Sequence, residues 1–191
     1  MVRGKLTFIS GGVRSGKSAY AEQLLVQKAH ANGGRLVYIA SGTATDSEMA
    51  ERIKRHQEDR SSANWTTYEQ PKTLETLLPF IRRGDFVLWD CMTTWLANEL
   101  YDGWETGTPC IGESGCMEQK EKRLHETIDT ILSKASQFVI VSNEVLDEYP
   151  SSHVEVQLYS EWLGRLHQKI VNTADTAIEM DYGLAKVWKS R

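Results

Sequence analysis

Short apolar runs recur along the chain, separated by glycine-containing turns and by amphipathic stretches. The clearest runs, at 6–10, 36–40, 86–90 and 138–142, are continuous rather than alternating, which is typical of parallel strands buried on both faces. A shorter segment at 65–69 also favours a strand or an extended segment. Strands of this kind, alternating with helical patterns, predict an α/β fold in which helices cover both faces of a mostly parallel sheet.

Helical periodicity occupies the intervals between these runs, over 46–60, 73–82, 117–135 and 154–173. The first of these helices opens with a capping box, Thr45-Asp46-Ser47-Glu48. Near the end of the chain, strands at 177–180 and 184–188 flank a Tyr182-Gly183 turn. We therefore expect a short C-terminal β-hairpin beside the parallel sheet.

The length of 191 residues predicts a single domain over 1–191. Residues 102–116 hold four of the fourteen glycines together with Pro109, so we expect a mobile loop between two helices there. Such a loop is typical both of a lid over an active site and of a plain surface connection.

Charge and cysteine content narrow the range of partners. The 22 basic and 26 acidic residues are interspersed and the net charge is -4, which favours a small-molecule partner over nucleic acid. No apolar run is long enough for a signal peptide or a membrane span, and we expect a cytoplasmic protein. Cys110 and Cys116 are interpreted as incidental loop cysteines, with a metal or redox pair as the alternative.

The segment directly after the first apolar run carries the most specific motif. It reads Gly11-Gly12-Val13-Arg14-Ser15-Gly16-Lys17-Ser18, which matches the Walker A pattern G-x-x-x-x-G-K-[ST]. In such a loop the backbone N–H groups surround a polyphosphate, Lys17 reaches the outer phosphates and Ser18 offers a hydroxyl to Mg²⁺. A chance match is disfavoured because a strand pattern precedes the motif and a helical pattern follows it. We expect a phosphate loop that binds a nucleoside triphosphate such as ATP or GTP.

The run at 86–90 ends in Asp90, as a Walker B strand does. A strand of that type delivers a carboxylate to the Mg²⁺ side of the phosphate loop. The alternative is an ordinary acid at the end of a strand, but the Walker A motif favours a place for Asp90 near the metal or the nucleotide. Asn143-Glu144 closes the run at 138–142, at the strand end where α/β sheets place ligands.

A histidine on the expected 46–60 helix adds a second chemistry. Arg52, His56 and Arg60 form a stripe at steps of four residues. The arginines would disfavour protonation of His56, and a neutral imidazole beside cationic groups is a suitable nucleophile toward a phosphate. Periodicity alone favours the simpler alternative of a boundary histidine on an amphipathic helix.

Further motifs follow in a fixed order. They are Tyr38-Ile39-Ala40, Asp46-x-Glu48-Met49, Arg52-Ile53-x-x-His56-x-x-x-Arg60, Trp65-x-Thr67-x-Glu69, Asp90-Cys91-Met92-Thr93-x-Trp95-x-x-Asn98 and Ser142-Asn143-Glu144-Val145. Together with the Walker A segment, their order and spacing over about residues 5–145 resemble the bifunctional adenosylcobinamide kinase/adenosylcobinamide-phosphate guanylyltransferase family of cobalamin biosynthesis. Such a set is far more specific than a Walker A motif alone.

That resemblance implies a RecA-like P-loop NTPase fold and two reactions. The first phosphorylates the aminopropanol hydroxyl of adenosylcobinamide with ATP or GTP. The second transfers GMP from GTP to the new phosphate through a guanylylated histidine, which is His56 here, and gives adenosylcobinamide-GDP. The resemblance also implies a homotrimer.

By the same resemblance, the GTP site combines the phosphate loop with residues from other segments. These are Ala40, Ser41, Gly42, Arg52, Arg60, Glu69 and Asp90. We expect Lys17 and His56 to be catalytic, and Ser18 and Asp90 to hold Mg²⁺.

The chain departs from the family pattern in the motifs on the side of the corrinoid acceptor rather than in those of the nucleotide. A glycine-rich G-x-G-I-V-P stretch is replaced by residues 146–150, which contain no glycine, and Ser61-Ser62 stands where a proline is usual. An F-R-D-x-x-G-x-x-N-Q pattern becomes residues 159–168, with His167 in place of the asparagine. The nucleotide half of the pattern is intact and the acceptor half is altered.

Two other functions fit part of this pattern. One is a small-molecule P-loop kinase that acts on a different alcohol, with His56 in a structural role. The other is a non-catalytic nucleotide-binding paralogue. The joint presence of Lys17, Asp90 and His56 disfavours the paralogue, because a protein that only binds nucleotide needs neither a Mg²⁺ acid nor a helix-borne imidazole.

Overall fold

The computed structural model describes residues 3–42, 63–145 and 152–190. The expected helix at 46–60 lies outside the described residues, and with it Arg52, His56 and Arg60. The altered segment at 146–150 is outside them as well, whereas the whole Walker A motif and Asp90 are inside.

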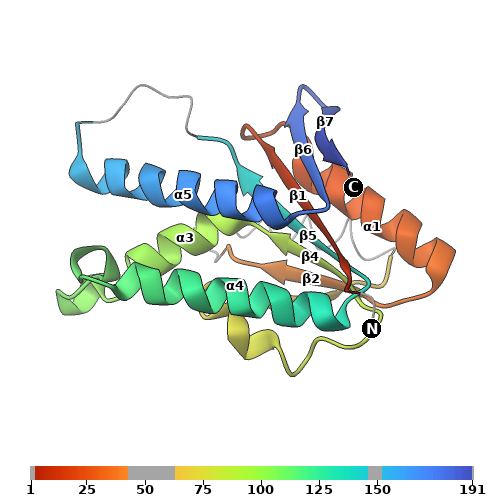
Figure 1. Cartoon of the computed structure of the whole chain (residues 1–191), viewed down its shortest axis with the longest axis horizontal. Helices are drawn as coiled ribbons and strands as arrows, with labels where there is room; N and C mark the ends of the chain where they lie inside the picture. Colours follow the sequence, from red (N-terminus) through yellow and green to blue (C-terminus); the bar gives the residue numbers. More distant parts are fainter. Residues whose placement is uncertain (1–2, 43–62, 146–151, 191) are drawn as a thin grey trace.

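A seven-stranded sheet forms the centre of the described chain (Figure 1). Across the sheet the strands are β3 (Thr66–Glu69), β2 (Leu36–Ala40), β4 (Phe86–Asp90), β5 (Gln137–Asn143), β1 (Lys5–Gly11), β6 (Thr176–Asp181) and β7 (Leu184–Ser190). All neighbouring strands are parallel except β6 and β7, which form an antiparallel hairpin. The predicted parallel sheet and C-terminal hairpin are confirmed.

Helices cover both faces of this sheet, as predicted. Helix α1 (Lys17–Asn32) packs on one face, and α3 (Met92–Leu100), α4 (Cys116–Lys134) and α5 (Val154–Thr173) pack on the other (Figure 1). None of the described helices has the length and apolar character needed to cross a bilayer.

Central strands send alternate side chains into two cores. Phe8 and Trp89 face the core that includes α3, α4 and α5, whereas Ile9 and Leu88 face the core under α1. Each of the four is at most 2% exposed, and burying a side chain of this kind contributes about 1.5–3 kcal/mol. Burial on both faces explains why the sequence of each strand is a continuous apolar run. The two cores also fix the position of the strand ends, where the Walker A motif and Asp90 lie.

The prediction of a helix over 73–82 is wrong. Within this segment only η1 (Leu74–Leu77), a single 3₁₀ turn, is helical. An α-helix would need the N–H of residue 79 to bond the carbonyl of Glu75, but Pro79 has no N–H and its ring clashes with that carbonyl. The apolar periodicity was still informative, because Leu74 and Leu77 are buried.

The connection from α3 to α4 contains two short 3₁₀ helices, η2 (Trp104–Thr106) and η3 (Cys110–Gly112). A disulfide joins Cys110 to Cys116 and ties η3 to the start of α4. The interpretation of these cysteines as incidental is therefore wrong. Their spacing in the sequence did not show that the two side chains meet. Cys91 is the free cysteine, and it is buried.

Candidate functional site

The Walker A residues link the carboxyl end of β1 to the first turn of α1. The chain turns sharply there, with Arg14 at φ 64° and Gly16 at φ 91°, and Ser15 N–H donates to the carbonyl of Gly12 at 3.2 Å. Gly11 cannot carry a side chain, because a Cβ would lie 2.3 Å from the carbonyl oxygen of Met180. The motif therefore folds as the compact loop that its glycines predict.

Lys17 and Ser18 occupy the first turn of α1. Lys17 is 7% exposed and its Nζ donates a 2.9 Å hydrogen bond to the carbonyl of Gly12, so the ammonium lies over the loop. Ser18 is half-buried, and the first turn of the helix contains no acidic residue. Unpaired N–H groups at a helix N-terminus and a nearby ammonium make this a suitable place for an anion.

Asp90 ends β4, which is separated from β1 by β5. The hydroxyl of Tyr38, from the neighbouring strand β2, donates to Oδ2 of Asp90 at 2.9 Å. Ala40 is paired in register with Asp90 on one side and with Glu69 on the other. Three of the residues predicted for the GTP site therefore lie in one row at the carboxyl edge of the sheet.

The segment that leaves β2 is held from several sides. Ser41 N–H donates to the Asp90 carbonyl at 3.0 Å, and Trp89 Nε1 donates to Ser41 Oγ at 2.7 Å. The side-chain amide of Asn98 on α3 donates to the carbonyl of Ser41 at 3.0 Å and to that of Pro71 at 3.1 Å. Asn98 thus joins the segment after β2 to the segment after β3.

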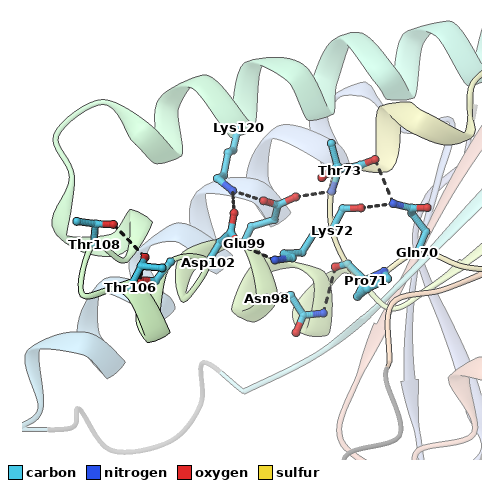
Figure 2. Close-up of polar contacts among 11 residues, drawn as sticks. Gln70, Pro71, Lys72, Thr73, Asn98, Glu99, Asp102, Thr106, Thr108 and Lys120 are labelled. Atoms are coloured by element: carbon cyan, nitrogen blue, oxygen red, sulfur yellow. Dashed lines mark hydrogen bonds and ion pairs between the residues drawn. The ribbon is translucent and has the colours of Figure 1, made fainter.

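Figure 2 shows the polar network that continues from this bridge. The next residue on α3, Glu99, is 4% exposed, accepts a 2.7 Å hydrogen bond from Thr73 N–H and forms an ion pair with Lys120. Asp102 bonds Lys120 at 3.2 Å and Lys72 at 2.5 Å. Its hydrogen bond with Lys72 lowers the pKa of Asp102 and raises that of Lys72. The network fixes residues 70–73, directly after Glu69, against α3 and α4.

A buried histidine lies under the carboxyl end of β5. His167 Nε2 is 2.8 Å from Ser142 Oγ, and Nδ1 is 4.0 Å from Glu144 Oε2. Burial lowers the pKa of His167 to about 4, so the ring is neutral near pH 7. Glu144 N–H in turn donates to the carbonyl of Gly11, which begins the phosphate loop.

The described residues thus bring together the phosphate loop, Ala40, Ser41, Glu69 and Asp90 at one edge of the sheet. The predicted residues His56, Arg52 and Arg60 lie outside the described part of the chain. Asn98 was visible in the sequence only as a motif position without a role, because its contacts join segments that are distant in the chain.

A mostly parallel sheet with a Walker A loop at the carboxyl end of β1 defines a P-loop nucleotide-binding protein of the α/β class. Two solved structures share this fold. An ATPase from the type III secretion system of pathogenic bacteria aligns at 12% identity and TM-score 0.56, over 97% of this chain and 57% of that one. A KaiC-like protein from Pyrococcus horikoshii OT3 aligns at 11% identity and TM-score 0.55, over 99% and 80%.

Comparison of sequences identifies the family, which the shared fold alone does not. Residues 7–187 match the family described as cobinamide kinase / cobinamide phosphate guanyltransferase, and the chain belongs to this family. The bifunctional adenosylcobalamin biosynthesis protein CobU of Escherichia coli K12 is 30% identical over 173 residues, 89% of this chain and 92% of the relative. The CobU protein of Salmonella typhimurium LT2 is 28% identical over 176 residues, with the same coverage. The resemblance drawn from the motifs is confirmed.

Proposed function

We propose that this chain catalyses both reactions of its family, the phosphorylation of adenosylcobinamide and the transfer of GMP from GTP to the resulting phosphate. The observation that carries the proposal is the phosphate loop itself. Lys17 lies over the loop at the N-terminus of α1, while Glu69 and Asp90 end neighbouring strands at the same edge of the sheet. Family membership over residues 7–187 supports the choice of reactions.

In the kinase step, backbone N–H groups of the loop and the Lys17 ammonium hold the triphosphate of ATP or GTP. The hydroxyl oxygen of the acceptor attacks the γ-phosphorus, the bond from that phosphorus to the bridging oxygen breaks, and the nucleoside diphosphate leaves. The hydroxyl proton passes to water. Within the described residues Ser15 Oγ is buried without a hydrogen-bond partner, and a phosphate oxygen would satisfy it.

Magnesium fits the oxygen donors at this edge. Mg²⁺ prefers hard oxygen ligands and usually keeps few protein ligands beside phosphates and water, so the Ser18 hydroxyl and the Asp90 carboxylate are a sufficient protein contribution. When bound, the ion would neutralise charge on the phosphates.

In the guanylyl step, His56 is the nucleophile. Its imidazole nitrogen attacks the α-phosphorus of GTP and pyrophosphate leaves. An oxygen of adenosylcobinamide phosphate then attacks the same phosphorus, the phosphorus–nitrogen bond breaks, and adenosylcobinamide-GDP forms. Arg52 and Arg60 would neutralise phosphate charge beside His56, while residues 40–42 and Glu69 would line the GTP site.

We further propose that the protein is a homotrimer, as the family resemblance implies, and that it works in the cytoplasm, as the sequence pattern favours. Light scattering coupled to size-exclusion chromatography tests the assembly: three chains per particle support it, and a stable monomer at working concentration contradicts it. Fractionation of cells that produce the protein tests the compartment.

Product analysis tests the two reactions. Purified protein is incubated with adenosylcobinamide, Mg²⁺ and GTP, and the corrinoid products are separated by chromatography. Lys17→Ala should lower both products by about two orders of magnitude or more, because it removes a charge that aligns the phosphates. His56→Ala should accumulate adenosylcobinamide phosphate and form no adenosylcobinamide-GDP. Equal loss of both products in His56→Ala would contradict the nucleophile, and full turnover by Lys17→Ala would contradict the P-loop assignment.

A further inference from the structure

A hollow of about 520 Å³ lies beside the phosphate loop. One wall begins at Gly16, which precedes α1, and continues along α1 at steps of three or four residues with Ala19, Tyr20, Gln23 and Val26. Glu22 borders this stripe. The other walls come from Met180 and Gly183 of the β6–β7 hairpin and from Trp65, directly before β3.

The lining of the hollow suits a nucleobase. It is mostly apolar and aromatic, with the carboxamide of Gln23 and the carboxylate of Glu22 as polar groups. Its volume falls in the range of small-ligand pockets, about 300–1,000 Å³. Aromatic side chains such as Tyr20 and Trp65 present faces on which a base can stack, and such stacking contributes about 1–3 kcal/mol per base.

The position of the hollow matches the direction in which a bound nucleotide must extend. In a Walker A loop the backbone holds the α- and β-phosphates and the lysine reaches the β- and γ-phosphates. Lys17 Nζ lies against Gly12, whereas the hollow begins at Gly16, at the other end of the loop. The nucleoside, which is attached to the α-phosphate, can therefore enter the hollow along α1.

The hairpin wall is fixed to the loop. Gly183 N–H donates a 3.1 Å hydrogen bond to the carbonyl of Ser15, and a Cβ on Gly16 would lie 3.6 Å from Gly183 Cα. The loop that holds the phosphates and the wall that would contact the base therefore form one unit, so both parts of a nucleotide would be positioned together.

We propose that this hollow binds the purine base of the nucleoside triphosphate held by the phosphate loop. Tyr20 lies against the face of the base, and Gln23 and Glu22 meet its polar edge. A carboxamide both donates and accepts hydrogen bonds, so Gln23 can serve adenine and guanine. The inference rests on the phosphate-loop part of the proposed function and adds the location of the base.

Equilibrium binding of three Mg²⁺-complexed probes tests the inference: the β,γ-imido analogues of ATP and GTP, and inorganic tripolyphosphate, which has no base. Gln23 is exposed, so Gln23→Trp fills the hollow without changing the core. Lys28→Trp adds the same bulk at an exposed position of α1 that does not line the hollow, and is the matched control. Thermal unfolding checks that both variants are folded.

Gln23→Trp should weaken both nucleotide analogues about tenfold or more, as loss of base contacts predicts, and leave tripolyphosphate binding within about twofold. Lys28→Trp should bind all three probes like the wild type. Unchanged nucleotide binding by Gln23→Trp would overturn the proposal, as would equal weakening of tripolyphosphate. If Gln23→Trp binds all three probes like the wild type and only raises the KM for the corrinoid in the product assay, the proposal is overturned and the hollow belongs to the acceptor. Failure of wild-type protein to bind any probe would contradict the phosphate loop itself, which is a separate outcome.

Discussion

The hydroxyl of Tyr38 donates a 2.9 Å hydrogen bond to Oδ2 of Asp90, across the neighbouring strands β2 and β4. Tyr38 is 7% exposed and its ring packs edge to face on Trp65, so the hydroxyl is held in place. The acid proposed to bind Mg²⁺ is therefore oriented by a buried partner that is not itself a ligand.

Tyr38→Phe should keep the packing and remove this hydrogen bond. Hydrogen bonds to charged groups are worth about 1.5–3 kcal/mol, so we expect kcat/KM of the kinase step to fall about tenfold and the Mg²⁺ concentration for half-maximal rate to rise. Initial rates over a Mg²⁺ series measure both. Tyr159→Phe, which removes a hydrogen bond to the carbonyl of Thr93, is the control and should keep the wild-type Mg²⁺ dependence. An unchanged Mg²⁺ profile in Tyr38→Phe would show that the bond does not orient the acid.

Asn98 should act on the nucleotide site by positioning the segments that leave β2 and β3. Asn98→Leu leaves the carbonyls of Ser41 and Pro71 without these donors; a fully buried group left in this way costs about 1–3 kcal/mol, and these two bonds are partly buried. We expect a lower melting temperature and a KM for GTP in guanylyl transfer that rises more than the KM for ATP in the kinase step. Thr106→Ala, the control, removes an exposed local hydrogen bond to the carbonyl of Gly103 and should change neither KM. Equal changes in both KM values would indicate general loss of structure.

His167 predicts a stability that depends on pH. Burial lowers its folded-state pKa to about 4, against about 6.5 in an unfolded chain, so below pH 6.5 the unfolded state binds the extra proton. The contribution of a neutral His167 to the free energy of unfolding should therefore be complete above pH 6.5. It should fall by about 3 kcal/mol as the pH drops to 4.

The difference between variants isolates this contribution. His167→Asn, which restores the residue of the family pattern, should lose that part of the slope, whereas the exposed His30→Asn should keep the wild-type slope. Urea unfolding at a series of pH values measures each profile. Parallel wild-type and His167→Asn profiles would contradict a neutral buried histidine.

The disulfide between Cys110 and Cys116 should be measurable by thiol titration. In denaturant without reductant, one thiol per chain should react, that of Cys91, and all three should react after reduction. The bond spans only six residues, so the double change Cys110→Ser, Cys116→Ser should lower the free energy of unfolding by about 2 kcal/mol. Three reactive thiols before reduction would contradict the bond.

Sequence patterns predicted those features that local physics determines. Continuous apolar runs became buried strands because both faces of the sheet are covered, and the glycines of the Walker A motif became a tight loop before α1. The gathering of Ala40, Glu69 and Asp90 in one site was implied by the family resemblance, and the structure places them in one row because parallel strands end at a common edge.

Features that depend on tertiary contacts were not predictable in this way. The bridge by Asn98 joins α3 to segments 27 and 57 residues away in the chain, and nothing in its local sequence marks these partners. Helical periodicity over 73–82 was misleading because a single residue, Pro79, outweighs several favourable positions. The pairing of Cys110 with Cys116 depends on how η3 packs against α4, which spacing does not specify.

A guanylylated His56 should be detectable directly, as a label that GTP leaves on the protein. Wild-type protein and His56→Ala are incubated with Mg²⁺ and GTP labelled at the α-phosphate, without corrinoid, and with γ-labelled GTP in parallel. Transfer of GMP through His56 predicts protein-bound label from the α-position only, released by acid, stable to base and absent in His56→Ala. Absence of α-label in wild-type protein that binds GTP, or equal labelling of His56→Ala, would contradict transfer of GMP through His56.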